Sequence, residues 1–281
     1  MTIPAFAAGL CDDAAVFPPG SMPLAEAVPA HLRHKASRHA ALVGSFVVAA
    51  PMLKELGTRL DGDGPVLDLV VTVPAGPGAL PDVAAEAAAL PVRLAGIEVA
   101  VPPGLPAAEL RDALDRGAPE GVPVFVEVPR DERRPEIIAA LPGTPYRAKF
   151  RTGGVEAALH PGETELAAAI KAVVDAGVPF KATAGLHHAV RNTDPGTGFE
   201  QHGFLNLLLA VDAALGGAGE EDLAAILARR DGTGVAVGIT NLDASQVRAR
   251  FLSFGTCSIT DPLTDLAALG LVAEAIEGDP S

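Results

Sequence analysis

The sequence is poor in aromatic and sulfur-containing residues. Its 281 residues include no tryptophan, one tyrosine and two cysteines, Cys11 and Cys257. Two cysteines cannot build the disulfide framework of a small secreted domain, and no Cys-x-x-Cys pair indicates a zinc site. Hydrophobic residues nevertheless make up 49% of the chain. This content excludes general disorder and predicts a large core of aliphatic side chains.

Basic residues and long apolar runs are also scarce. The chain has 21 Lys and Arg against 35 Asp and Glu, a formal net charge of −14. Such a surface repels phosphate backbones and anionic membranes, so we expect neither nucleic acid nor membrane as a partner. The first residues lack the basic segment of a signal peptide. No uninterrupted apolar run is as long as the roughly 18 residues that a helix needs to cross a bilayer. We therefore expect a cytoplasmic protein.

What the sequence does contain is a repeated pattern of strand, turn and helix. Most of the expected strands are continuously apolar, as in parallel strands covered on both faces. The clearest strands are 42–50, 66–73, 92–101, 122–129, 146–152, 179–185 and 251–258. Helical patterns lie between them, at 22–40, 82–90, 105–116, 131–140 and 163–176. A final helix is expected to begin at Asp261, as N-cap, and Pro262.

An eighth strand completes the pattern. Residues 8–17 are the better candidate, because a full helical stretch follows them. The rival, 234–240, lies about eleven residues before the next strand, which is the minimum for a parallel crossover. With 8–17 as strand one, the alternation predicts an α/β fold, a (βα)8 barrel formed by residues 1–281 as a single domain.

The segment 192–250 is then a helical insertion between strands seven and eight. It has a loop rich in Gly, Asp and Thr, and helical patterns near 203–215 and 220–230. Because it follows the carboxyl end of a barrel strand, we expect it beside the active face. In this position the insertion could serve as a lid over the active site, or it could form a subunit contact in a homo-oligomer.

Two lysines stand near the ends of neighbouring strands. Lys149 is followed at period two by Arg151, and Lys181 by Thr183. If these residues point into the barrel, the two ammonium groups face each other. Packing two cations into a low-dielectric lumen disfavours both charges, so one lysine should have a lowered pKa. A neutral lysine can attack a carbonyl group and form a Schiff base.

The order of motifs along the chain resembles deoxyribose-phosphate aldolase and related lysine-dependent aldolase barrels. The similar segments follow the barrel strands: 10–13 (LCDD), 46–51 (FVVAAP), 70–76 (VVTVPAG), 148–153 (AKFRTG), 181–185 (KATAG) and 255–258 (GTCS). The resemblance covers most of residues 10–260 outside the insertion. It implies Lys149 as the Schiff-base nucleophile and Lys181 as its pKa partner. Glu98 stands where the family has an aspartate, and Glu127 matches its strand-five glutamate.

We therefore expect an aldolase-like carbon–carbon lyase that needs no cofactor. Glu98 with an ordered water, or His187, would move the proton. The substrate would be a small carbonyl compound with a carboxylate or phosphate, held by Arg151 and the strand-eight turn. The residues expected to bind it are Asp12, Asp13, Glu127, Arg151, Thr183, Gly255, Thr256 and Ser258. Asp12 and Asp13 are either a carboxylate pair at the barrel mouth or a helix-capping turn.

Two other functions remain open from the sequence. One is a metal-dependent lyase or hydrolase that uses His187, His202, Glu98 and Glu127, although no HxH or HExxH spacing supports it, and we expect no metal. The other is a barrel without chemistry that binds a metabolite or serves in assembly. In that case Lys149 and Lys181 are strand-end lysines in salt bridges with Glu98 and Glu127.

Overall fold

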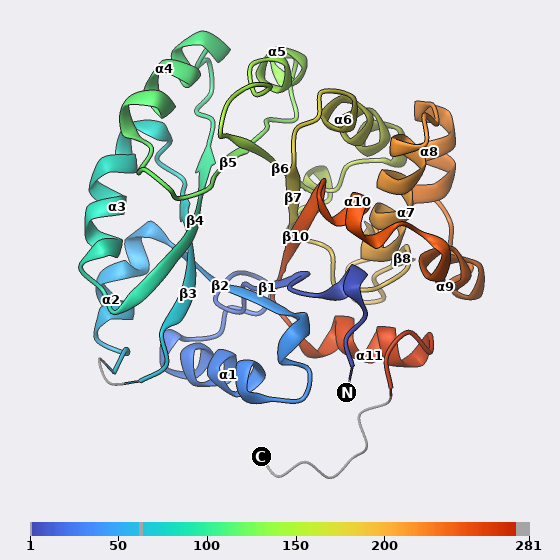
Figure 1. Ribbon diagram of the computed structural model, residues 1–281, viewed down its shortest axis with the longest axis horizontal. Helices are drawn as coiled ribbons and strands as arrows, with labels where there is room; N and C mark the ends of the chain where they lie inside the picture. Colours follow the sequence, from blue (N-terminus) through green and yellow to red (C-terminus); the bar gives the residue numbers. More distant parts are fainter. Residues whose placement is uncertain (1, 62–63, 274–281) are drawn as a thin grey trace.

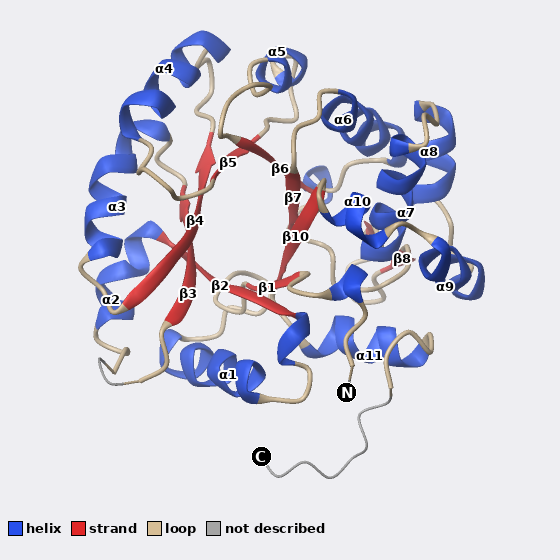
Figure 2. Ribbon diagram, viewed as in Figure 1, coloured by secondary structure: helices blue, strands red, loops and turns tan. Residues whose placement is uncertain are grey.

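Eight parallel strands close into a barrel with helices around it (Figures 1 and 2). The computed structural model describes residues 2–61 and 64–273. The barrel strands are β1 (Cys11–Asp13), β2 (Val43–Ala49), β3 (Leu67–Val73), β4 (Val92–Ala100), β5 (Val124–Glu127), β6 (Arg147–Arg151), β7 (Phe180–Thr183) and β10 (Phe251–Thr256). Each lies within one of the eight segments predicted as strands. The fold is the predicted (βα)8 or TIM barrel.

The helical layer covers the outer face of the barrel. Its helices between and after the strands are α1 (Leu24–Ala36), α2 (Leu53–Gly57), α3 (Leu80–Ala88), α4 (Ala107–Gly117), α5 (Arg134–Ala139), α6 (Glu163–Asp175), α7 (Phe204–Leu215) and α11 (Thr260–Ala268). In α4, for example, Ala107, Leu110 and Leu114 lie on one buried stripe, with Glu109 in the first turn and Arg116 in the last. Apolar spacing of three and four residues and charges matched to the helix dipole favour a helix here. The short α2 was not predicted.

Strand register determines which side chains share the lumen. In the pairing of β6 with β7, Lys149 lies opposite Lys181 and Arg151 opposite Thr183. In the pairing of β5 with β6, Glu127 lies opposite Lys149. Successive side chains point to opposite faces of a strand, so these residues point inward while Ala148, Phe150 and Ala182 point outward. The predicted period-two alignment of the lysine strands is confirmed.

The segment between β7 and β10 holds a short hairpin and four helices. The hairpin pairs β8 (Asn192–Thr193) with β9 (Glu200–Gln201). Beyond it lie α7, then α8 (Glu220–Leu227), α9 (Gly232–Asn241) and α10 (Ala244–Arg248). Helix α7 contacts both α6 and β10, whereas α8 packs on α6 and α7 and α9 packs on α7 (Figure 1). Helix α7 therefore occupies the place of the barrel's own seventh helix, and the added elements are the hairpin, α8, α9 and α10.

The rejected strand 234–240 lies in helix α9. Asp231 is the N-cap of this helix, and its carboxylate accepts a hydrogen bond from the Gly234 amide at 3.1 Å. Val235 and Ile239 are buried one turn apart, which is helical spacing. The N-cap and the burial of residues four apart favour a helix, and they outweigh the preference of the β-branched residues in this segment for a strand.

Helix α11 begins two residues earlier than predicted. Its N-cap is Ile259, and Asp261 lies inside the first turn, so the prediction of Asp261 as N-cap is wrong. The Asp261 amide instead donates to Ser258 Oγ at 3.2 Å. Ser258 takes this role because the chain already turns at the end of β10.

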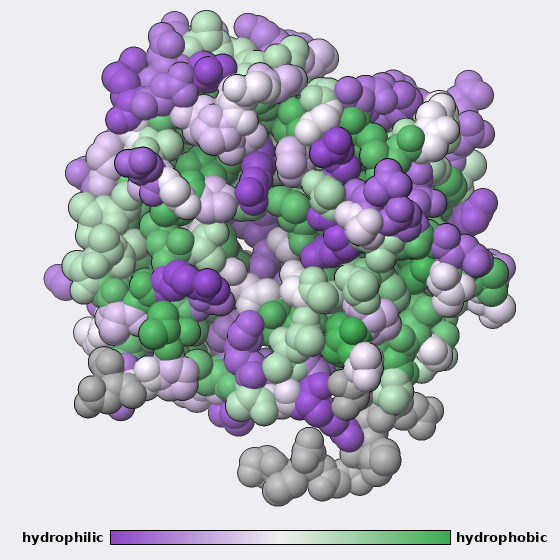
Figure 3. Space-filling model, viewed as in Figure 1, coloured by the Kyte–Doolittle hydropathy of each residue, from purple (hydrophilic) through white to green (hydrophobic). Residues whose placement is uncertain are grey.

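The molecular surface is mixed in character. Hydrophilic and hydrophobic residues alternate over the face in Figure 3. Within residues 2–61 and 64–273, no helix has the length and apolar character required to traverse a bilayer.

Candidate functional site

A chain of buried ion pairs crosses the middle of the barrel lumen. The Glu98 carboxylate is at its centre, with Oε2 at 2.7 Å from Lys149 Nζ and Oε1 at 2.5 Å from Lys181 Nζ. Lys149 Nζ also lies 2.9 Å from Glu127 Oε2, and Lys181 Nζ lies 2.7 Å from Asp12 Oδ2. Glu98 thus bridges the two lysines, and each lysine has a second carboxylate on its far side.

Neutral donors and one further cation complete this chain. Asp12 accepts hydrogen bonds from Ser253 Oγ at 2.6 Å and from the Ser45 amide at 2.9 Å. At the other end, Arg151 Nε donates to Glu127 Oε1 at 3.0 Å. We call the six charged residues Asp12, Glu98, Glu127, Lys149, Arg151 and Lys181 the lumen network. It has three carboxylates and three cations, so its formal charges cancel.

A glycine makes room for Asp12. A Cβ atom at Gly44 of β2 would lie 2.2 Å from Asp12 Oδ1, a distance that real Cβ atoms do not show. The neighbouring strand therefore has no side chain at this level, and Asp12 fills the space. Ser253 is on the same face of β10 as Gly255, so period-two alternation could have identified it as an inward polar group.

The pKa values of the network differ from the sequence-based expectation. Burial lowers the pKa of Lys149, but Glu98 and then Glu127 outweigh it and leave the pKa above its ordinary value. Burial likewise lowers the pKa of Lys181, and Asp12 and Glu98 raise it by more. Burial raises the pKa of Glu98, but the two lysines bring it down to about 2. The prediction of a lowered lysine pKa is wrong for the unliganded protein, because a carboxylate lies between the two ammonium groups.

A cavity of about 750 Å³ opens above this network, at the carboxyl ends of the strands. Seven of the predicted site residues line it: Glu98, Glu127, Lys149, Arg151, Thr183, His187 and Gly255. Lys149 is 3% exposed and forms part of the cavity wall. Asp12 and Lys181 do not line the cavity and lie behind Glu98. The barrel therefore presents one lysine to a ligand and keeps the other as support.

Four predicted binding residues have other positions. Asp12 points into the lumen, whereas Asp13 points to the helical layer, with Oδ2 at 3.0 Å from His31 Nδ1 of α1. They are not a pair at the barrel mouth, because consecutive strand residues face opposite ways. Thr256 Oγ1 donates to the Ser258 carbonyl at 3.0 Å and accepts from the Ser258 amide at 3.3 Å. Neither Thr256 nor Ser258 lines the cavity.

Side chains from the loops form the cavity mouth. His187, after β7, has Nδ1 at 3.5 Å from Cys257 Sγ, after β10. Burial lowers the pKa of His187, so its ring is neutral at pH 7, and burial raises the pKa of the Cys257 thiol. Asp194 and Asp261 also line the cavity. Sequence reasoning missed Cys257, Asp194 and Asp261 as cavity residues, and their positions after barrel strands were the available signal.

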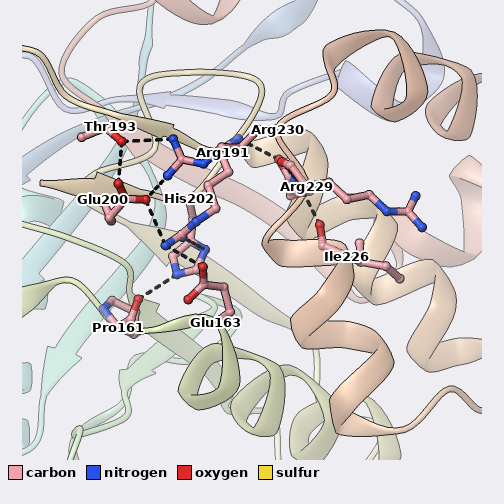
Figure 4. A network of polar contacts seen from close by, with 10 residues as sticks. Pro161, Glu163, Arg191, Thr193, Glu200, His202, Ile226, Arg229 and Arg230 are labelled. Atoms are coloured by element: carbon pink, nitrogen blue, oxygen red, sulfur yellow. Dashed lines mark hydrogen bonds and ion pairs between the residues drawn. The ribbon is translucent and has the colours of Figure 1, made fainter.

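A second network of polar contacts, centred on the buried Arg191, anchors the hairpin (Figure 4). Arg191 Nη2 lies 2.7 Å from Glu163 Oε1 at the start of α6 and 3.4 Å from Glu200 Oε2 in β9. Arg191 Nη1 lies 3.2 Å from His202 Nδ1. None of these four residues lines the cavity. We call Glu163, Arg191, Glu200 and His202 the hairpin network.

The position of His202 bears on a metal site. Its Nε2 lies 2.8 Å from the Pro161 carbonyl and its Nδ1 contacts Arg191, so both ring nitrogens have partners. His202 is fully buried away from His187, Glu98 and Glu127, which line the cavity. In the described part of the chain, no three or more His, Cys, Asp and Glu side chains are grouped so that they could hold a metal ion. The four residues of the metal hypothesis are not brought together.

The fold and this cavity define the protein as a (βα)8 barrel with a charged site at the end where barrel enzymes have their active sites. Comparison with the sequence models of known protein families and with curated proteins gave no match. The chemistry of the site must therefore be argued from the site itself.

Proposed function

We propose that this protein is a carbon–carbon lyase that binds a small carbonyl compound as an imine on Lys149. One observation carries the proposal: the amine of Lys149 is in the wall of the cavity, between the carboxylates of Glu98 and Glu127. Among the described residues that line the cavity it is the only lysine. An amine at the end of a barrel strand, open to a cavity, is the arrangement that covalent catalysis by lysine requires.

The charge balance of the lumen network favours this chemistry. An imine formed by Lys149 is protonated and carries the same single positive charge as the ammonium group that it replaces. The three carboxylates therefore stay neutralised when the substrate is attached. Fixed charges that match the charge of an intermediate stabilise it without rearrangement. The two carboxylates beside Lys149 thus favour the iminium ion.

The same carboxylates make the first step costly. The amine must lose its proton before it attacks, which costs an ordinary lysine about 5 kcal/mol at pH 7. Deprotonation of Lys149 costs more free energy than this, because its pKa is raised. Glu98 is a poor acceptor for this proton, because both of its oxygens bind lysines and its pKa is about 2. Imine formation should therefore be slow at neutral pH and faster in alkali.

Imine formation and the cleavage that follows it take the ordinary course of a retro-aldol reaction. The Lys149 nitrogen attacks the carbonyl carbon, and the oxygen leaves as water. The iminium then accepts the electron pair of the adjacent carbon–carbon bond, and the departing fragment's hydroxyl loses its proton. His187 fits the role of proton acceptor, because it lines the cavity and is neutral at pH 7. Protonation of the enamine and addition of water release the second fragment.

Lys181 and Arg151 have supporting roles in this proposal. Lys181 is a positioning residue, because it holds Glu98 and Asp12 and has no contact with the cavity. Arg151 uses Nε for Glu127, and its Nη groups make no hydrogen bond to any residue that the structure describes. Those groups are available to a substrate oxygen.

Reductive trapping tests the proposal. The purified protein is incubated with small aldehydes and ketones, reduced with borohydride, and its intact mass is measured. We expect one adduct that peptide mapping assigns to Lys149, absent from Lys149→Ala and retained in Lys171→Ala. Lys171 is the matched control because it pairs with Asp175 on α6, outside the cavity. A broad carbonyl panel without any Lys149 adduct would contradict the proposed function.

A further inference from the structure

Barrels often hold a phosphate group at the loops after the seventh and eighth strands, with help from a helix N-terminus. In this protein three backbone amides near these loops have partners within the chain. After β7, the Ala189 amide donates to Asp265 Oδ2 at 2.8 Å. After β10, the Ser258 amide donates to Thr256 Oγ1 and the Asp261 amide to Ser258 Oγ. These three amides are thus bonded to the protein's own oxygens, one of them a carboxylate.

Helix α11 is also a poor anion site in its own right. Its first turn contains Pro262, which has no amide hydrogen to donate. The same turn contains Asp261, whose carboxylate already takes the favourable position at a helix N-terminus.

The charges of the cavity wall lead to the same conclusion. The lining cations are Lys149 and Arg151, and both are paired with carboxylates of the lumen network, Arg151 through Nε alone. Four lining residues are acidic: Glu98, Glu127, Asp194 and Asp261. The wall has two cations and four carboxylates, a net charge of −2 from the Lys, Arg, Asp and Glu side chains. A phosphate dianion entering this space meets repulsion in a region of reduced dielectric.

Uncharged hydroxyl groups find unused partners in the same wall. Gln201 is 7% exposed and lines the cavity, and its side-chain amide makes no hydrogen bond to a described residue. His160 Nδ1 is buried without a partner and belongs to another lining residue. The Asp261 carboxylate likewise accepts no hydrogen bond from the rest of the described chain. An amide, an imidazole nitrogen and a carboxylate together can donate to and accept from hydroxyl groups.

We infer that the cavity takes an uncharged, hydroxyl-bearing aldehyde or ketone and excludes its phosphate ester. The inference rests on the proposed imine at Lys149 and specifies its substrate class. It differs from the expectation of a carboxylate or phosphate on the substrate. Asp261 enforces the selection, because its carboxylate repels an anion at the cavity mouth.

Pairs of ligands that differ only in the phosphate group test this inference. Glyceraldehyde is compared with glyceraldehyde 3-phosphate, and dihydroxyacetone with dihydroxyacetone phosphate, by the rate of borohydride-trapped adduct at Lys149. We expect the uncharged member of each pair to react at least about tenfold faster at low salt. Added salt should narrow the difference, because it screens the repulsion. Equal or faster trapping of the phosphate esters would overturn the inference while supporting the imine.

A matched pair of variants identifies the source of selectivity. Asp261→Asn should shift the preference toward the phosphate ester about three- to tenfold, whereas Asp112→Asn should not. Asp112 is an exposed residue of α4, so its substitution changes the net charge equally but outside the cavity. An identical shift in both variants would assign the effect to overall charge and contradict the inference.

Binding of inorganic phosphate separates this inference from the imine proposal. Phosphate is titrated into the wild-type protein by calorimetry, which needs no reaction at Lys149. We expect no binding at millimolar concentrations. Millimolar phosphate binding that Lys149→Ala preserves and that competes with glyceraldehyde would overturn the inference whether or not an imine forms. Absence of binding supports it, even if every carbonyl compound fails to trap.

Discussion

The lumen network and the hairpin network use the same side-chain types in different surroundings. Both bury a cation among carboxylates: Lys149 and Lys181 in one, Arg191 in the other. In the lumen, four of the six charged residues reach the wall of the cavity. In the hairpin network none does, and the bonds of Arg191 join β9, the start of α6 and His202 (Figure 4).

Whether a network reaches the cavity distinguishes a structural role from a candidate chemical role. Every hydrogen bond of the hairpin network ties one chain segment to another, so the network holds the hairpin against the barrel. The lumen network also ties strands together, but Lys149 and three of its other members line the cavity. A charged group perturbed by its neighbours becomes a candidate reactive group only where a ligand can reach it. Access, more than burial, distinguishes the two networks.

The largest expected effect on stability comes from removing Lys181. The substitution Lys181→Met leaves Asp12 without a cation and Glu98 with one, both deep in the barrel. We expect a loss of about 3–5 kcal/mol in the free energy of unfolding, measured with urea at pH 7. Lys171→Met, which breaks an i,i+4 pair on α6, should cost under about 1 kcal/mol. Similar losses in both variants would contradict the assignment of Lys181 as a buried support.

The next largest effect is expected in the pH dependence of the rate at which the proposed imine forms. Because the pKa of Lys149 is raised, its neutral fraction increases with pH throughout the accessible range. The rate of adduct formation should rise about tenfold per pH unit between about pH 7 and pH 10, about 4 kcal/mol in total. Rates are obtained by quenching timed incubations with borohydride, with Lys149→Ala as the background. A rate that is flat above neutral pH would show that Lys149 is not protonated in the free protein.

Acid should weaken the hairpin network before the lumen network. Burial lowers the pKa of His202 from 6.5 to about 4. As the pH falls below 6.5, the unfolded chain takes up the proton first, so stability decreases until about pH 4 by about 3 kcal/mol. For Glu98, with a pKa lowered to about 2, stability is complete above 4.5 and is lost as the pH falls toward 2.

His202→Gln separates these two windows. The variant lacks the titrating ring, so its free energy of unfolding should change less than that of the wild type between pH 6.5 and pH 4. Below about pH 4 both proteins should lose stability in parallel, because Glu98 is present in both. Equal slopes above pH 4 would mean that another group causes the upper transition. Urea unfolding over this pH range is the measurement.

The smallest effect is expected at the exposed edge of the hairpin network. Arg230 pairs with Glu200, and the two side chains are 49% and 46% exposed. Arg230→Met should cost under about 1 kcal/mol, because an exposed ion pair is screened by water. A loss as large as that of Lys181→Met would contradict the distinction between exposed and buried pairs.

The sequence predicted the barrel well because strand periodicity is local. The inward alignment of Lys149 with Arg151, and of Lys181 with Thr183, follows from alternation along two neighbouring strands. The eighth strand could be chosen by the length of chain needed for a crossover, and 234–240 is indeed helical. These features depend on spacing alone.

The electrostatics of the site could not be read in the same way. The position of the Glu98 carboxylate between the two lysines depends on the closure of the barrel. Without that position the two ammonium groups suggest a lowered pKa, and with it both values are raised. The cavity mouth was predicted only in part. Asp194, Gln201 and Asp261 follow barrel strands, but the path of the chain after each strand determines which of these side chains reach the cavity.

Gly44 has a consequence for how this sequence can change. Because a Cβ at position 44 would collide with the Asp12 carboxylate, a mutation there is tolerated only after the aspartate has been shortened or has turned away. Asp12 in turn holds Lys181, so its loss exposes the lysine to an unbalanced interior. We therefore expect the residue at position 12 to limit which residues are tolerated at positions 44 and 181. Among descendants of this chain, the residues at these three positions should be inherited or replaced together.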